Sequence, residues 1–136
     1  MSVTQLSVFV QNKRGRITEL VSLLAANDIN IFAFSVADVS DYGIVRVLAE
    51  HAGRAHTVLT EAGFTTKADP VVSVPLVDKV GSLAKVLELV TECGATIDYL
   101  YLSARMSVVL RVDDVDAVER RLVAAGFAPL NEQEVD

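Results

Sequence analysis

The apolar residues Leu6, Val8 and Val10 alternate with Ser7 and Phe9, a spacing that predicts a first strand. Apolar residues then recur three and four positions apart, which is the spacing of one buried face of a helix. They are Ile17, Leu20, Val21 and Leu24. Two longer apolar segments, 29–38 and 44–49, predict a pair of strands joined by a turn at 40–43. A second helix over 51–62 and a short strand from Phe64 complete this set of elements.

The same order of elements occurs a second time along the chain. Residues 72–83 repeat residues 6–17 at an offset of 66 (81 − 15, the numbers of two matched glycines). Residues identical in both copies include Ser7 and Ser73, Lys13 and Lys79, and Gly15 and Gly81. Farther on, 125–127 repeat 62–64 at an offset of 63 (126 − 63), so the second copy has a shorter hairpin. The repeat predicts two small domains of one fold, 1–69 and 70–136.

Each copy therefore has the order β-α-β-β-α-β, which is the ferredoxin-like plan. The predicted fold class is α+β, with two ferredoxin-like βαββαβ units in tandem and antiparallel sheets that carry helices on one face. In the second copy we expect strands over 95–103 and 107–112, a helix over 114–125 and a final strand from Phe127. Asp113 or Asp114 is the candidate N-cap of that last helix.

Pro75 conflicts with this plan because it falls in a strand that should be central. Proline has no backbone N–H and is normally confined to edge strands and bulges. Either a bulge at Pro75 or a nitrogen that faces a gap between the domains would remove the conflict.

Both faces of the long strands carry apolar side chains. Phe32, Phe34 and Val36 alternate with Ile31 and Ala33 in the first copy. The second copy has Leu100 and Leu102 opposite Tyr99 and Tyr101. One face packs under the helices, whereas the other would be polar if it met only water. We therefore expect this face or its edge to contact another surface, most simply in a homodimer.

Size and charge narrow the possible partners. The chain has 136 residues, of which 51% are hydrophobic, and a net charge of −6. Units of about 65 residues are marginally stable alone, so we expect them to pack on each other or on a second chain. The acidic balance argues against a nucleic-acid partner, which requires a basic face. No apolar run reaches the roughly 18 residues of a membrane span, so no membrane partner is expected.

The N-terminus lacks a basic region followed by an apolar core, so we expect no signal peptide. Cys93 is the single cysteine and cannot form a disulfide within the chain, which fits a cytoplasmic location. Cys93 itself is interpreted as a small buried residue rather than a nucleophile.

The loop after the first strand of each copy is the candidate ligand site, at 11–16 and 77–82. A glycine at the start of the following helix permits close approach of a ligand to the backbone. The first N–H groups of that helix are unpaired and attract a carboxylate. Asn12 offers a donor and an acceptor, whereas an ionised Asp78 only accepts. We expect Asn30 to lie next to the same helix end, so that the loop and Asn30 together suit an α-amino acid.

The residues Asn12-Lys13-Arg14-Gly15-Arg16-Ile17, followed by Asp28-Ile29-Asn30-Ile31, resemble the signature of ACT domains. Asp78-Lys79-Val80-Gly81-Ser82-Leu83, followed by Ala95-Thr96-Ile97, resemble it again. ACT domains are ferredoxin-like regulatory modules that bind amino acids where two of them meet. Serine-inhibited phosphoglycerate dehydrogenases are among the enzymes that carry them. The resemblance covers nearly the whole chain twice, so the chain is similar to a stand-alone tandem ACT protein with no catalytic domain.

The resemblance implies particular ligand-binding residues. In the dehydrogenase family, ligand-binding asparagines occupy the positions of Asn12 and Asn30. The second copy departs from this pattern with Asp78 and Thr96, and Arg14 stands where a proline often precedes the glycine. The candidate ligand-binding residues are Asn12, Arg14, Gly15, Arg16, Ile17, Asn30 and Ile31 in the first copy and Asp78, Val80, Gly81, Ser82, Leu83 and Thr96 in the second.

Other interpretations of these residues are open. The basic side chains of 13–16 are also what an ordinary solvated loop carries, and Asn12 is also a common helix cap. His51 and His56 are five positions apart, off the spacing of a shared metal site, so neither a metal nor a cofactor is expected.

The sequence favours a regulatory protein that binds a small molecule, most simply an amino acid, and acts on a partner enzyme. An assembly module that binds another protein through an open sheet face is one alternative, and a small ferredoxin-like enzyme is another. No Ser-His-Asp grouping, metal-ligand spacing or phosphate loop is present in the sequence, so catalysis is not expected.

Overall fold

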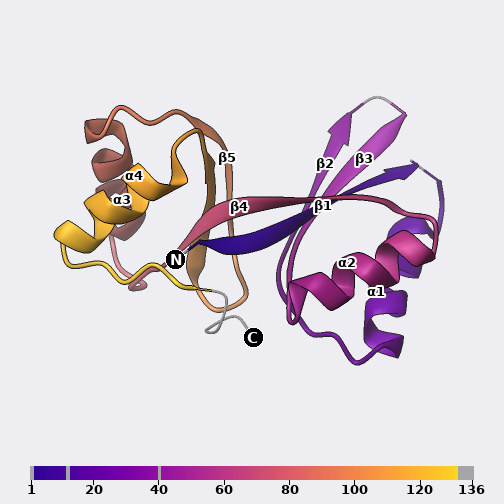
Figure 1. The fold of residues 1–136 in the computed structure, drawn as a ribbon. Helices are drawn as coiled ribbons and strands as arrows, with labels where there is room; N and C mark the ends of the chain where they lie inside the picture. The colour runs from indigo at the N-terminus through magenta and orange to yellow at the C-terminus, as the bar shows by residue number, and fades with distance from the viewer. Residues whose placement is uncertain (1, 12, 40, 132–136) are drawn as a thin grey trace. The chain divides into compact units, whose positions relative to one another are not determined.

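The computed structural model describes residues 2–11, 13–39 and 41–131, which form six strands and four helices. They follow one another as β1 (Val3–Gln11), α1 (Arg16–Ala26), β2 (Ile31–Val39), β3 (Tyr42–Ala49), α2 (Ala52–Glu61), β4 (Thr65–Pro75), α3 (Ser82–Glu92), β5 (Ile97–Leu102), β6 (Ser107–Val112) and α4 (Val115–Ala124). These elements form two compact units (Figure 1). The first is Thr4–Asp69, and the second begins at Pro70 and includes Val3.

The first unit is a sheet with strand order β2-β3-β1-β4, and α1 and α2 lie on one of its faces (Figure 1). In the β1–β3 ladder Leu6 pairs with Val47 and Val8 with Val45. Residues directly opposite each other share a face, so these apolar residues form the floor of the core. The helices cover that floor with buried residues at helical spacing, which are Leu20 and Leu24 of α1 and Ala55 and Leu59 of α2.

The second unit repeats this arrangement with strand order β4-β6-β5 and with α3 and α4 against the sheet. Val72 pairs with Leu110 and Val74 with Val108. These strand residues pack against Val86, Leu89 and Val90 of α3 and Val118 and Leu122 of α4. Asp114 is the N-cap of α4 because its carboxylate accepts a hydrogen bond from the Ala117 backbone N–H at 3.1 Å. The two units therefore confirm the predicted α+β ferredoxin-like plan.

One strand serves both copies, which the sequence pattern did not predict. The final strand expected from Phe64 and the first strand of the second copy form a single strand, β4. The unit boundary falls inside it, between Asp69 and Pro70. Pro75 is the last residue of β4 and pairs with Ser107, and the next ladder bond runs from the Leu76 N–H to the Met106 carbonyl at 2.8 Å. Proline is tolerated there because the strand ends at that residue.

The strand expected from Phe127 does not form within the described part of the chain. Residues 128–131 have no regular secondary structure. The Leu130 N–H nevertheless donates to the Ser73 carbonyl at 2.7 Å, so this segment runs beside β4 for one hydrogen bond. One backbone hydrogen bond does not make a β-ladder, so the segment is not a strand.

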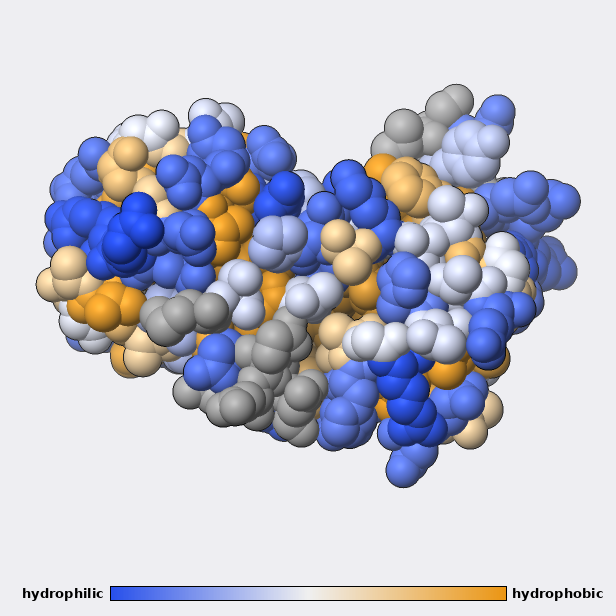
Figure 2. Space-filling model, in the orientation of Figure 1, coloured by the Kyte–Doolittle hydropathy of each residue, from blue (hydrophilic) through white to orange (hydrophobic). Residues whose placement is uncertain are grey.

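Apolar side chains also reach the surface of both units (Figure 2). Four of them lie on the edge strands β2 and β5, namely Phe34, Val36, Leu100 and Leu102. Among the described residues, the helices are too short or too polar to cross a bilayer.

Candidate functional site

The two loops that precede α1 and α3 have the same backbone geometry. Gly15 has φ 86° and ψ −7°, and Gly81 has φ 87° and ψ −5°, both in the left-handed region that favours glycine. In each loop the first helical N–H donates to the carbonyl of the lysine three residues earlier, at 3.3 Å. Neither helix has a side-chain cap, so backbone N–H groups of the first turn are open to an acidic ligand.

In the first loop, the predicted cations differ in what they contact. Arg14 is exposed, whereas Arg16 is held inside its own unit. The Arg16 Nη1 donates to Glu19 Oε2 at 2.8 Å, and its guanidinium carbon lies 4.5 Å from the centroid of the Phe64 ring. Ile17 is 40% exposed beside it. Asn12 lies outside the described residues.

In the second loop, the predicted residues are mostly solvated. Asp78, Val80 and Gly81 are exposed, Ser82 is half-buried, and Leu83 packs against the core of its unit. Ser82 stands where the first copy has Arg16, so the first residue of this helix is not a cation.

The expectation that Asn30 lies next to the Gly15 end of α1 is wrong. Gln11 pairs with Tyr42, and Ile31 pairs with Ala49, so Asn30 precedes β2 at the opposite end of the sheet. From Tyr42 to Ala49 is seven residues (49 − 42), or about 23 Å at the rise of an extended strand. The reason is topological. Helix α1 runs back along the sheet, so the residue that follows it emerges at the far end.

Asn30 and Thr96 have the same local role in their units. The Asn30 carbonyl accepts from the Glu50 N–H at 2.8 Å, and the Thr96 carbonyl accepts from the Asp113 N–H at 3.2 Å. The Thr96 N–H also donates to Asp113 Oδ1 at 2.8 Å. Both side chains are exposed, and Ile31 packs against the first core.

A polar pocket of about 310 Å³ lies at the Gly15 end of the first unit. Gln11, Lys13, Asp41 and Tyr42 line it. Gln11 and Tyr42 are partners across the β1–β3 ladder, which places the β2–β3 hairpin beside the loop that leads into α1. The pocket therefore brings an ammonium, a carboxylate, an amide and a phenol together next to an uncapped helix start. The sequence pattern predicted only a turn at 40–43. In the predicted β-α-β-β order, this turn joins two neighbouring antiparallel strands, and that connection was the signal that could have located Asp41.

Within the described ranges, no three side chains of His, Cys, Asp or Glu are grouped so that they could hold a metal ion. The side chains that line the pocket can bind charged and hydrogen-bonding groups.

A family model described as an ACT domain pair matches residues 1–135. The chain belongs to this family, a class of regulatory domains that bind small molecules. A protein of Bacteroides thetaiotaomicron with a crystal structure is 31% identical to it, with a TM-score of 0.92. That match covers 99% of this chain and 96% of the other. No curated protein matches the chain.

The regulatory subunits of aspartate kinase from Thermus thermophilus and Thermus flavus have the same fold. Their TM-scores are 0.66 and 0.59, at 16% and 19% identity, and each match covers 92% of this chain and 93% of the subunit. At this identity the likeness establishes the fold alone.

Proposed function

We propose that this ACT domain pair is a regulatory protein that binds a free amino acid at the Gly15 end of the first unit. The observation that carries the proposal is the pocket of Gln11, Lys13, Asp41 and Tyr42 beside the uncapped start of α1. Binding of the amino acid would change the packing of the protein, and a regulated enzyme would respond to that change. The coupling free energy between the two binding events would be about 1–3 kcal/mol. The single cysteine fits the reducing cytoplasm that we propose as its location.

The charges in this pocket match both ends of an α-amino acid. Lys13 and the first N–H groups of α1 suit the carboxylate, because a helix N-terminus carries a partial positive charge. Asp41 suits the ammonium, and Gln11 and the Tyr42 hydroxyl can donate or accept at the side chain. Asn12 and Arg14 remain candidate ligands on the same loop.

The second unit is less suited to the same ligand. Val77, 66% exposed, replaces Gln11 at the matched position (77 − 11 = 66). Its hairpin turn reads Ser103-Ala104-Arg105-Met106 and contains no carboxylate for an ammonium. We therefore propose that the first unit holds the amino acid and that Asp78, Val80, Gly81, Ser82 and Leu83 form a loop of the same shape without the same ligand.

Asn30 can join the first site only from another ACT unit, because it lies at the far end of its own sheet. We propose a homodimer in which the β2 edges of two chains pair around a twofold axis. Such a pair is antiparallel, so the start of one β2 lies beside the end of the other. Asn30 of the partner subunit would then lie beside the hairpin end that carries Asp41. The exposed Phe34 and Val36 on β2 support an edge that is covered in the assembly.

A thermal unfolding screen against the twenty amino acids tests the proposal. The ligand at a hundredfold excess over its Kd should stabilise the protein by about 2.7 kcal/mol. Asp41→Asn and Lys13→Met should each weaken binding about tenfold or more, because each removes one charge-assisted hydrogen bond. Arg105→Ala in the second hairpin is the matched control and should bind as the native protein does. Absence of a shift with all twenty amino acids would refute the proposal.

A further inference from the structure

Helix α4 carries a buried carboxylate that accepts no hydrogen bond from the described residues. Glu119 is 2% exposed, and neither Oε1 nor Oε2 has a hydrogen-bond partner among the described residues. An ionised carboxylate in such a place is strongly destabilised unless a cation or hydrogen-bond donors compensate it. The positive charge of the chain's N-terminus opposes the rise in the pKa of the Glu119 carboxyl, but no described residue donates a hydrogen bond to this carboxylate or forms an ion pair with it. A hydrogen-bonding cation from outside the unit therefore has a reason to bind.

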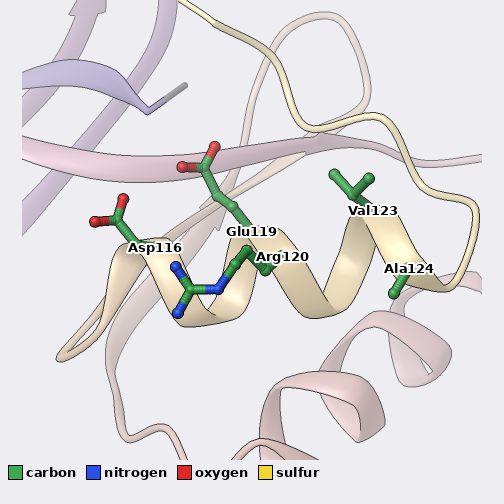
Figure 3. Close-up of a pocket in the computed structure, with 5 residues that line it drawn as sticks. All are labelled: Asp116, Glu119, Arg120, Val123 and Ala124. Carbon is green, nitrogen blue, oxygen red and sulfur yellow. The ribbon is translucent and has the colours of Figure 1, made fainter.

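Glu119 lines a groove of about 400 Å³ on the surface of α4. The other lining residues are Asp116, Arg120, Val123 and Ala124. Figure 3 shows the carboxylates of Asp116 and Glu119 projecting to the same side of the helix, with Val123 one turn farther on. Val123 is 48% exposed, so the acidic end of the groove continues into an apolar end. The volume is within the range of small-ligand sites.

The first unit shows that the fold does not require this carboxylate. At the repeat offset of 63, His56 of α2 stands where α4 has Glu119. Asp116, Arg120, Val123 and Ala124 are matched by Gly53, Thr57, Thr60 and Glu61. Both helices nevertheless pack on their sheets through equivalent apolar residues, Leu59 and Leu122. The groove with its paired acids is thus a property of the second unit and not of the ACT fold.

We propose that the α4 groove binds a small primary alkylammonium ion, with Glu119 and Asp116 contacting the ammonium and Val123 and Ala124 contacting the alkyl chain. Charge complementarity favours a cation, since two carboxylates face a single Arg120 that forms no ion pair with any described residue. A hard metal ion fits less well, because it requires more oxygen ligands than two carboxylates provide. This site is separate from the amino-acid pocket of the first unit and does not depend on it.

Titration of the full chain with n-butylammonium chloride tests the proposal, at constant ionic strength and with n-butanol as the uncharged control. Calorimetry gives the affinity, and amide chemical shifts locate the ligand. We expect butylammonium, and not butanol, to shift amides of 116–124. Glu119→Gln should weaken binding about tenfold or more, and Asp116→Asn should weaken it to a smaller extent. Arg120→Gln should bind equally or more tightly, because it removes a competing cation.

His56→Gln is the matched control at the equivalent position of α2 and should leave the affinity unchanged. The proposal is overturned if butylammonium does not bind, if butanol binds equally, or if the shifted amides lie outside α4. It is also overturned if Glu119→Gln binds as tightly as the native protein. If that variant does not fold, Asp116→Asn decides, and an unchanged affinity in it overturns the proposal.

Discussion

The guanidinium of Arg16 lies 4.5 Å from the centre of the Phe64 ring and donates a hydrogen bond of 2.8 Å to Glu19. The contact joins the first residue of α1 to the residue just before β4. A cation that the sequence places in a ligand loop is therefore engaged in the packing of its own unit. In the second copy Ser82 replaces Arg16, so no equivalent contact can form with Phe127.

Replacement of Arg16 by Ala should lower the free energy of unfolding by about 1 kcal/mol, the sum of a partly exposed cation–π contact and an exposed ion pair. Ser82→Ala is the matched change in the second copy and should stay within about 0.5 kcal/mol of the native protein. Urea denaturation measures both. If Arg16→Ala keeps full stability and loses only amino-acid binding, Arg16 is a ligand residue and the packing role is wrong.

The two helix-start glycines should have similar costs of substitution. An added Cβ at Gly15 or Gly81 would meet no atom within 4 Å, so the cost comes only from the left-handed backbone. Ala at either position should destabilise by about 1–2 kcal/mol. Gly53 of α2 is the control, because its backbone is helical and its Cβ also meets nothing. Gly53→Ala should stabilise by about 0.5–1 kcal/mol. Thermal unfolding shows whether each substitution raises or lowers the stability. A stabilising Gly15→Ala would contradict the left-handed backbone assigned to Gly15.

Stability should depend on pH through Glu119. Burial raises the pKa of its carboxyl above the ordinary value, Asp116 raises it further, and the positive charge of the chain's N-terminus opposes the rise. The folded protein therefore binds more protons than the unfolded chain between the two pKa values. The stabilising contribution is complete below the unfolded pKa, about 4.3, and is lost as pH rises through the folded pKa.

Glu119→Gln removes this titration, so the variant should be more stable than the native protein at pH 7. The difference should shrink as the pH is lowered toward 4. Urea midpoints measured from pH 4 to pH 8 give the comparison, with Glu88→Gln on the exposed face of α3 as the control. A native protein that gains stability relative to Glu119→Gln as pH rises would show that the carboxylate is compensated in the folded state.

The apolar residues on the edge strands should control self-association. Phe34 and Val36 on β2 correspond to Leu100 and Leu102 on β5 at the repeat offset of 66 (100 − 34 and 102 − 36), and all four are exposed. Val36→Lys should favour the monomer, because charged residues on an edge oppose strand pairing. Val123→Lys is the control, since Val123 is about equally exposed but lies on α4. Light scattering after size exclusion gives the mass. A Val36→Lys protein that keeps the native mass excludes pairing through β2.

Some elements could be predicted from the sequence because their signals are local. The spacing of Leu20 and Leu24 places one helix face in the core, and Gly15 and Gly81 mark the two helix starts. The shared strand β4 could not be predicted in this way, because Asp69-Pro70 interrupts the apolar alternation where the strand in fact continues. A proline at such a position ordinarily argues against one continuous central strand.

The amino-acid sequence by itself determined the duplication, the order of elements and the two loops of matched shape, because each follows from spacings within a few residues or from direct repetition. Only the tertiary structure decided which residues share a site. It placed Asn30 at the far end of the sheet from Gly15 and brought Asp41 and Tyr42 beside Lys13. It also buried the Glu119 carboxylate, which has no hydrogen-bond partner among the described residues. Proximity of this kind depends on strand register and on the direction of the helix that crosses the sheet, neither of which a short motif records.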